Sequence, residues 1–243
     1  MTTTRIFGIA FITGFSGAMM PGPMLTLVLG QVPIYGMAAV WAIVGGHAVL
    51  EIIVVLLLMA GLRPVLQRPA LRGGIGMVGG AFLAWMGVTM VLDAGSVSLA
   101  TEGAAESIPW GLLALQGAFV CIQNPYFTGW WATIGSGQLA HAAPCSIGEY
   151  AAFYLGHELS DFVWYALVGL IIVTGANWLS PTVYTWLILV SGAALVALSL
   201  WFIWTGVRFI WLGAGDEAAD LPTAGMVTEA CAGAGVAATD TEE

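Results

Sequence analysis

Two short segments each place a histidine and an acid four residues apart inside a long apolar stretch. They are Gly46-His47-Ala48-Val49-Leu50-Glu51 and Gly156-His157-Glu158-Leu159-Ser160-Asp161. Residues four apart share one face of a helix, so each histidine can reach its acid. Ionisable residues inside membrane helices cost roughly 2.5–3.5 kcal/mol each, and they are expected to be functional. Three interpretations are open. The acids could gain and lose a proton and so couple transport to protons, or they could bind an amine or a metal cation. In the third interpretation, the histidine–acid pairs only fix the packing of the helices. We predict that His47, Glu51, His157 and Asp161 form a proton- or ion-coupling set.

A second pattern places prolines within apolar stretches, where they interrupt helices. A proline frees backbone carbonyls, so in a membrane such a break is tolerated where protein or a water-filled cavity surrounds it. A half-helix that starts at a break presents free N–H groups suited to a carboxylate, and an asparagine adds amide donors. We therefore predict substrate-binding residues at two breaks: Ser16, Pro21, Gly22, Pro23, Gln123, Asn124 and Pro125.

The composition is that of an integral membrane protein. The chain is 59% hydrophobic and 8% charged, whereas a soluble domain carries roughly 25% charged residues. It has five arginines, no lysine and fourteen acids. With no basic stripe, no nucleic-acid partner is expected. The three cysteines lack the spacing of metal ligands, and no cofactor or resident metal is predicted. The tryptophans are interpreted mainly as interface-belt or packing residues.

Six apolar segments are long enough to cross a bilayer. They cover about 6–30, 35–61, 73–93, 109–135, 147–177 and 181–212. The predicted fold class is therefore an all-α integral membrane protein with six transmembrane helices, of which the first and fourth are broken. The transmembrane domain is expected to cover 1–212. Residues 213–243 are rich in Ala, Gly, Thr and acids, and they are predicted to be an acidic, disordered tail.

The arginines predict an orientation in the plasma membrane. With six spans, both termini and the loops after the second and fourth spans lie on one side. All five arginines fall on that side: Arg5, Arg63, Arg68, Arg72 and Arg208. The positive-inside rule then puts both termini in the cytoplasm.

The two halves of the chain, about 6–93 and 109–212, carry three matching motifs in the same order. Gly17-Ala18 before the first break matches Gly117-Ala118 before the second, and the two Gly-His-x-x-x-acid motifs occupy the next span of each half. The third spans share Trp85-x-Gly87-Val88 and Trp204-x-Gly206-Val207. Halves with an odd number of spans must be inverted relative to each other, as in many secondary transporters, whose substrate sites lie near the midplane.

These residues make the chain resemble the LysE/RhtB family of amino-acid exporters over about 6–212. The resemblance rests on Pro21-Gly22-Pro23, Gly36, Gly45-Gly46, Gly79-Gly80 through Trp85-x-Gly87, and Asn124-Pro125. It implies gradient-driven export of amino acids or similar small metabolites by a six-helix protein that forms homodimers. Two residues depart from the family pattern: Met24 follows Pro-Gly-Pro in place of the common Asn, and Tyr126 follows Asn-Pro in place of the usual Lys.

Two alternative functions use the same residues. The two histidines with Glu51 and Asp161 could serve as ligands in a carrier of divalent metals or small cations. The segment His157-Glu158-Leu159-Ser160-Asp161 is also close to the His-Glu-x-x-His motif of zinc-dependent intramembrane proteases, although Asp161 replaces the second histidine. The favoured interpretation is a non-enzymatic transporter whose partners are a small-molecule substrate and the lipid bilayer.

Overall fold

The computed structural model describes residues 1–61, 63–66, 68–95, 107–175 and 180–211, which form helices and contain no strand. Four helices are long and apolar enough to cross a membrane: α3 (Met37–Met59), α5 (Pro69–Asp93), α9 (Ile147–Gly175) and α10 (Pro181–Trp211). The chain is thus a multi-pass membrane protein. The predicted acidic tail, residues 213–243, lies outside the described residues.

The first predicted span is a broken helix. Helix α1 (Thr3–Ala18) ends just before Pro21, and α2 (Pro23–Tyr35) begins with a proline at its first position. The two axes meet at 80°, so together they count as one bent span or as a re-entrant segment. Pro21 cannot donate a backbone hydrogen bond, and Gly22 is extended with φ −159°, which stops α1 and restarts the chain as α2.

The fourth predicted span, 109–135, is also interrupted and forms no single continuous helix. Helix α6 (Trp110–Ile122) ends at Gln123, and α7 (Pro125–Trp130) follows with Asn124 as its N-cap. The Asn124 side chain accepts a hydrogen bond of 3.0 Å from the backbone N–H of Tyr126. The chain continues through one π-helical turn, η1 (Trp131–Gly135), into α8 (Ser136–Ala142). The remaining described helix is α4 (Arg63–Leu66), a single turn between α3 and α5.

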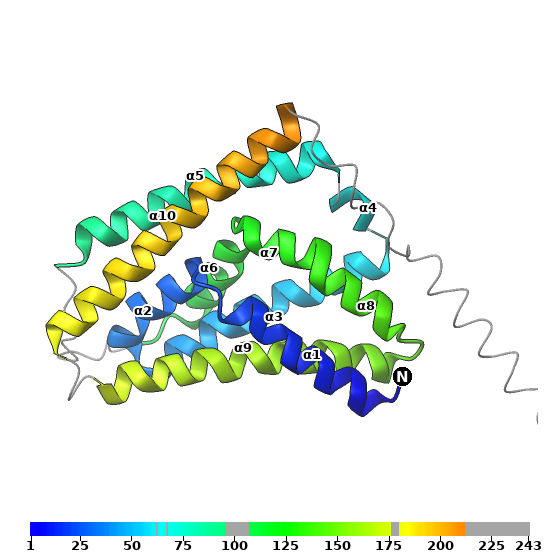
Figure 1. Ribbon diagram of the computed structural model, residues 1–243. Coiled ribbons are helices and arrows are strands. Elements are labelled where there is room, and N and C mark those ends of the chain that lie inside the picture. The colour runs from blue at the N-terminus through cyan, green and yellow to red at the C-terminus, as the bar shows by residue number, and fades with distance from the viewer. Residues whose placement is uncertain (62, 67, 96–106, 176–179, 212–243) are drawn as a thin grey trace, which may run out of the picture.

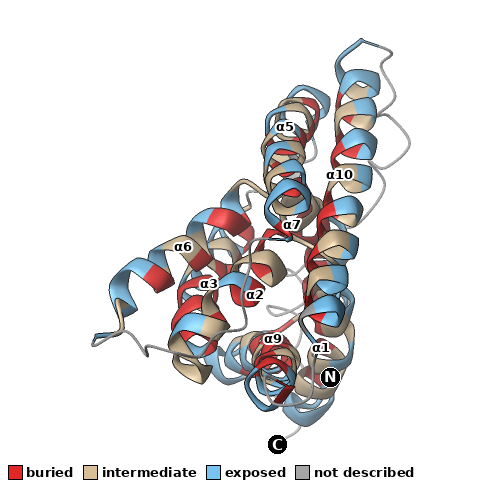
Figure 2. Ribbon diagram, turned by 90° about the vertical axis from the view of Figure 1, so that its left-hand side faces the viewer, coloured by how far each residue is buried: buried red, intermediate tan, exposed pale blue. Residues whose placement is uncertain are grey.

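The helices form two groups (Figure 1). Helices α5 and α10 pack along one another as a long pair, while α1 packs along α9 and α6 packs along α3 in the second group. Much of the surface of α5 and α10 is exposed (Figure 2). Exposed apolar side chains such as Val78, Leu92 and Leu200 cover this pair and suit contact with lipid.

Glycines set the two closest helix contacts around the site. A Cβ added at Gly46 of α3 would meet the backbone of Ala114 in α6, and one added at Gly156 of α9 would meet the backbone of Phe7 in α1. Small residues at such crossings allow helix backbones to approach closely in a membrane. Because each glycine directly precedes a histidine, both histidines are held where their helix meets a broken one.

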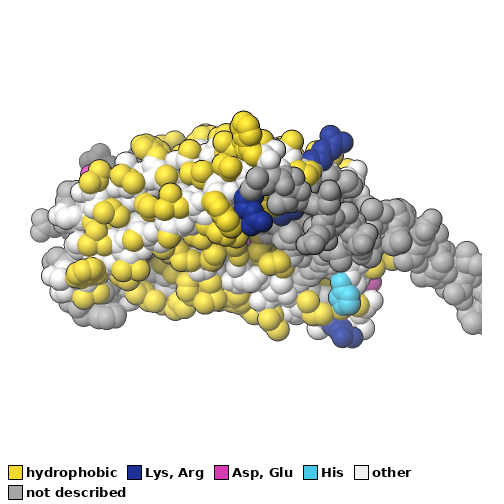
Figure 3. Space-filling view, turned by 45° about the horizontal axis from the view of Figure 1, so that its top comes forward, with side chains coloured by type: hydrophobic (Ala, Val, Ile, Leu, Met, Phe, Trp, Pro, Cys, Tyr) yellow, Lys and Arg dark blue, Asp and Glu magenta, His cyan; other side chains and the backbone are white. Residues whose placement is uncertain are grey.

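The described arginine side chains lie toward one end of the molecule, where α1 begins, α5 begins and α10 ends (Figures 1 and 3). Hydrophobic side chains cover the surface along the rest of that view.

Candidate functional site

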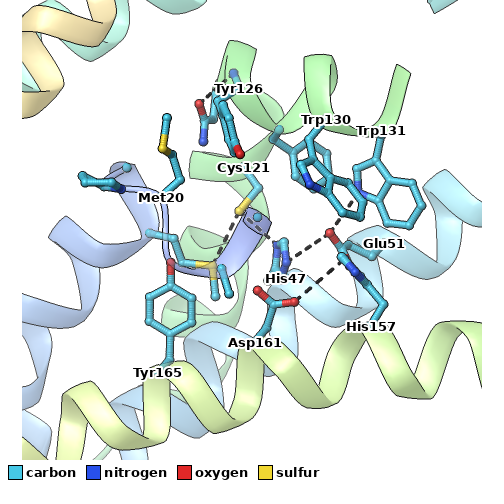
Figure 4. A pocket seen from close by; sticks show the side chains of 17 residues that line it. Met20, His47, Glu51, Cys121, Tyr126, Trp130, Trp131, His157, Asp161 and Tyr165 are labelled. Atoms are coloured by element: carbon cyan, nitrogen blue, oxygen red, sulfur yellow. Dashed lines mark hydrogen bonds and ion pairs between the residues drawn. The ribbon is translucent and has the colours of Figure 1, made fainter. Parts of the chain in front are cut away.

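Glu51 is the centre of a buried polar cluster between α3, α9 and the second broken helix (Figure 4). Its Oε1 atom accepts a hydrogen bond of 2.9 Å from the indole N–H of Trp131 and lies 3.2 Å from Nε2 of His47. Its other oxygen, Oε2, lies 2.9 Å from Nε2 of His157. The structure therefore brings the two Gly-His-x-x-x-acid motifs, more than one hundred residues apart in sequence, to a single carboxylate.

His47 links this cluster to the first helix break. Its Nδ1 lies 3.1 Å from the thiol sulfur of Cys121 on α6, and that thiol lies 3.9 Å from the sulfur of Met24 at the start of α2. The edge of the His47 ring meets Phe127, with ring centroids 5.7 Å apart. Both nitrogens of His47 thus have neighbours, which fixes the orientation of the ring.

Two further acids on α9 complete the cluster. Asp161 Oδ2 lies 3.8 Å from Nε2 of His157 and has no hydrogen-bond partner, although the residue is only 4% exposed. Glu158 is buried to the same extent and lies near Glu51 and the hydroxyl of Tyr154. Although Glu158 directly follows His157 and therefore points to another face of α9, it is buried as well, because α9 contacts α1, α2 and α3 on several sides.

Tryptophans of the second broken helix cover His157. The imidazole lies 4.7 Å from the ring of Trp130 and 5.1 Å from that of Trp131, measured between centroids. On the other side of Trp130, its indole N–H donates a hydrogen bond of 3.0 Å to the hydroxyl of Ser16 in α1. The Tyr126 hydroxyl donates one of 2.7 Å to the backbone carbonyl of Ser16. The last turn of α1 therefore holds two aromatic side chains of α7.

These groups surround a cavity of about 50 Å³, here called the polar cavity. Of the residues predicted from the sequence, it is lined by Pro21, Gly22, Asn124, His47, Glu51, His157 and Asp161. The other four predicted residues do not line it. Pro23 and Pro125 are buried at the starts of their helices, Ser16 bonds the aromatic side chains, and the Gln123 side chain returns to the carbonyl of Phe119.

The cluster can bind a proton or a cation. His47, Glu51 and Asp161 each offer one ligand atom, and these atoms lie within 4.8 Å of one another. Among the residues that the structure describes, no lysine or arginine lines the polar cavity. Uncompensated carboxylates in an apolar surrounding are costly, so a proton or a positively charged ligand stabilises them.

Several site residues were not predicted from the sequence. Trp130 and Trp131 were interpreted as belt or packing residues, and Cys121 as incidental. Their position in the sequence could have identified them, because all three lie within seven residues of the Asn124-Pro125 break. Two tyrosines also line the polar cavity: Tyr126 stood out only as a departure from the family pattern, and Tyr165 carried no signal of its own.

Comparisons with known proteins point to a transport family. A family model described as "LysE type translocator" matches residues 15–206. The chain is also 28% identical over 162 residues to the "Chemotactic transduction protein ChpE" of Pseudomonas aeruginosa (strain PAO1), an alignment that covers 65% of this chain and 78% of that protein. No solved structure matches the chain.

Proposed function

Because the chain belongs to the LysE type translocator family, we propose that it is a secondary transporter that exports amino acids or related small metabolites from the cytoplasm. Export would be coupled to a proton or ion gradient. Proteins of this family are transporters of small molecules across membranes, which also favours a carrier over the intramembrane-protease alternative.

The observation that carries the coupling proposal is the buried cluster around Glu51. If all five groups were ionised, the carboxylates of Glu51, Glu158 and Asp161 would outnumber the positive charges of His47 and His157 by one. A net charge in an apolar surrounding is costly, so a bound proton or cation completes the cluster. A group of this kind can release and rebind that proton or cation as the two sides of the membrane gain access in turn.

The substrate would bind next to this cluster, at the two helix breaks. The start of α2 at Gly22 has no side-chain cap, so its first N–H groups suit a carboxylate. Asn124 lies opposite, with its side-chain nitrogen 3.5 Å from a Cβ built at Gly22. The polar cavity of about 50 Å³ is far below the roughly 300 Å³ at which small-molecule pockets begin. The structure therefore corresponds to a closed state, and binding requires the breaks to separate.

We also propose the six-span arrangement of two inverted repeats. Its support is the reciprocal packing of α1 on α9 and α6 on α3, in which the broken helix of each half meets the histidine-bearing helix of the other. The clustering of arginines at one end supports the cytoplasmic placement of both termini. The homodimer is proposed from the family resemblance alone.

A second candidate function is transport of a divalent metal. A tetrahedral ion about 2.1 Å from its ligands separates the ligand atoms by about 3.4 Å. His47, Glu51 and Asp161 offer three ligand atoms within 4.8 Å of one another, so the side chains would have to close by about 1 Å to hold such an ion. This buried group of one histidine and two carboxylates is the observation behind the metal alternative.

One experiment separates the two candidates. The purified full-length chain would be placed in proteoliposomes loaded with single amino acids or with Zn²⁺, Mn²⁺ or Co²⁺, and efflux would be measured with and without a pH gradient. Amino-acid efflux that the pH gradient accelerates is expected. Metal efflux without amino-acid efflux would overturn the proposal in favour of the second candidate.

A further inference from the structure

A second cavity, of about 320 Å³, lies between the α5–α10 pair and the second broken helix. We call it the apolar cavity. It extends to Leu66 of α4, to Arg72 near the start of α5 and to Phe209 near the end of α10, so it reaches the end of the molecule that carries the arginines. Its volume lies in the range of roughly 300–1,000 Å³ of pockets that hold small molecules.

The walls of the apolar cavity suit an apolar body. They include the aliphatic and aromatic side chains Ile75, Ile134, Trp201, Phe202 and Phe209. Two of the threonine hydroxyls in the walls are hydrogen-bonded within their own helices. Thr133 donates a hydrogen bond of 2.6 Å to the carbonyl of Gly129, and Thr205 donates one of 3.0 Å to that of Phe202. Their methyl groups therefore remain to contact a ligand.

Arg72 is the one charged residue among the described residues that line this cavity. Its guanidinium lies over the ring of Phe209, 4.3 Å from the centroid, and no acid of the described part of the chain pairs with it. A guanidinium binds a carboxylate through two parallel hydrogen bonds. The described residues of the walls include no acidic side chain, so the cavity disfavours a ligand with a cationic side chain.

Tyr126 and Trp130 line both cavities, so these two side chains form a partition between them. Ser16 of α1 holds both through hydrogen bonds of 2.7 and 3.0 Å. The face of Trp130 can also attract an ammonium group. A zwitterion with its carboxylate at Arg72 would have its ammonium facing this partition, beyond which the acids of the polar cavity lie.

From these contacts we propose that the apolar cavity is the loading site on the arginine side of the membrane, and that its ligands are neutral amino acids with apolar side chains. This inference rests on the proposed function and deepens it. Arg72 binds the carboxylate, the cavity walls hold the side chain, and displacement of the Tyr126–Trp130 partition passes the ligand to the polar cavity.

The test measures equilibrium binding of tritiated L-leucine to the purified full-length protein by scintillation proximity. We expect Arg72→Gln to weaken leucine binding roughly ten- to a hundred-fold, because a charge-assisted hydrogen-bonded pair is lost. Arg68→Gln is the matched control, since Arg68 lies one helical turn earlier, is exposed and lines neither cavity. Leucinamide, which lacks the carboxylate, should displace leucine poorly from the wild type, and this arm tests the same contact without any variant. Leucinamide should bind Arg72→Gln as poorly as it binds the wild type.

A steric variant tests the location. A Cβ built at Gly129, which lines the apolar cavity, meets no atom within 4 Å, and the same holds for a Cβ at Gly137 outside it. Gly129→Phe should abolish leucine binding, whereas Gly137→Phe should leave it unchanged. Unchanged leucine affinity in both Arg72→Gln and Gly129→Phe would overturn the loading site, even if efflux is observed. Tighter binding of L-lysine than of L-leucine would overturn the ligand class. Leucine binding that follows these expectations without any efflux would support the loading site and contradict the proposed function instead.

Discussion

Replacing two neighbouring glycines of α3 with alanine should change stability in opposite directions. A Cβ at Gly45 meets no atom within 4 Å, whereas one at Gly46 would lie 2.6 Å from Cα of Ala114 and closer still to the carbonyl of that residue. Ordinary contacts of a Cβ begin at about 3.4 Å. The backbones of α3 and α6 would therefore have to separate by about 1 Å, since neither can yield as a flexible side chain would.

The two effects can be estimated separately. Gly45→Ala gains helix propensity and should stabilise the protein by about 0.5–1 kcal/mol. Gly46→Ala has the same gain, but the overpacking costs about 1–3 kcal/mol or more, so a net loss is expected. The separation of α3 from α6 would also lengthen the 3.1 Å contact between His47 and Cys121.

The assay is reversible unfolding of the purified protein in mixed micelles, with the free energy of unfolding compared between the two variants. Gly156→Ala, which meets the backbone of Phe7 in α1, should behave like Gly46→Ala. If Gly46→Ala proved as stable as Gly45→Ala, the close approach of α3 and α6 would be refuted, and with it the placement of His47.

Three further predictions concern the site. Asp161→Asn should abolish pH-driven efflux from proteoliposomes while the variant elutes as folded protein, and unchanged efflux would contradict the coupling role. Asn124→Ala removes the acceptor of the Tyr126 N–H and should lower the free energy of unfolding by about 1 kcal/mol, whereas Asn124→Ser should restore most of the loss. Ser16→Ala frees the Trp130 indole, and loss of one neutral hydrogen bond should raise efflux without a pH gradient about two- to ten-fold; a slower leak would count against the partition.

The sequence allowed the helix breaks and the rare intramembrane charges to be predicted, because both have local causes. Pro21 and Pro125 lack a backbone N–H and lie at the two points where one helix ends and the next begins. The spacing of His47 and Glu51 places them on one face of α3 without reference to any other helix. The membrane class and the transport family followed from composition and from the Pro-Gly-Pro motif, and the family match confirms the latter.

The contacts of the helix breaks and of the intramembrane charges are made with distant segments of the chain, and a single sequence does not reveal which segments meet. Trp131 bonds Glu51 across eighty positions, and its type gave no reason to separate it from the chain's other tryptophans. Glu158 is not in the predicted coupling set, because periodicity assigns a residue to a face but does not say how many sides of its helix are covered. Within the span predicted over 109–135, the break at Asn124-Pro125 was predicted, whereas the π-helical turn Trp131–Gly135 was not, because hydropathy averages over it.

The acids of α9 also affect how the protein enters the membrane. His157, Glu158 and Asp161 fall within five positions, and α9 is the least hydrophobic of the four long candidate spans. Each such residue opposes partition of an isolated helix from the translocon into lipid. In the folded protein these side chains face α1 and α3, which are synthesised earlier. We therefore expect α9 to insert efficiently only when α1 and α3 are already next to the translocon. The polar cluster would then make insertion of α9 depend on the earlier insertion of those helices.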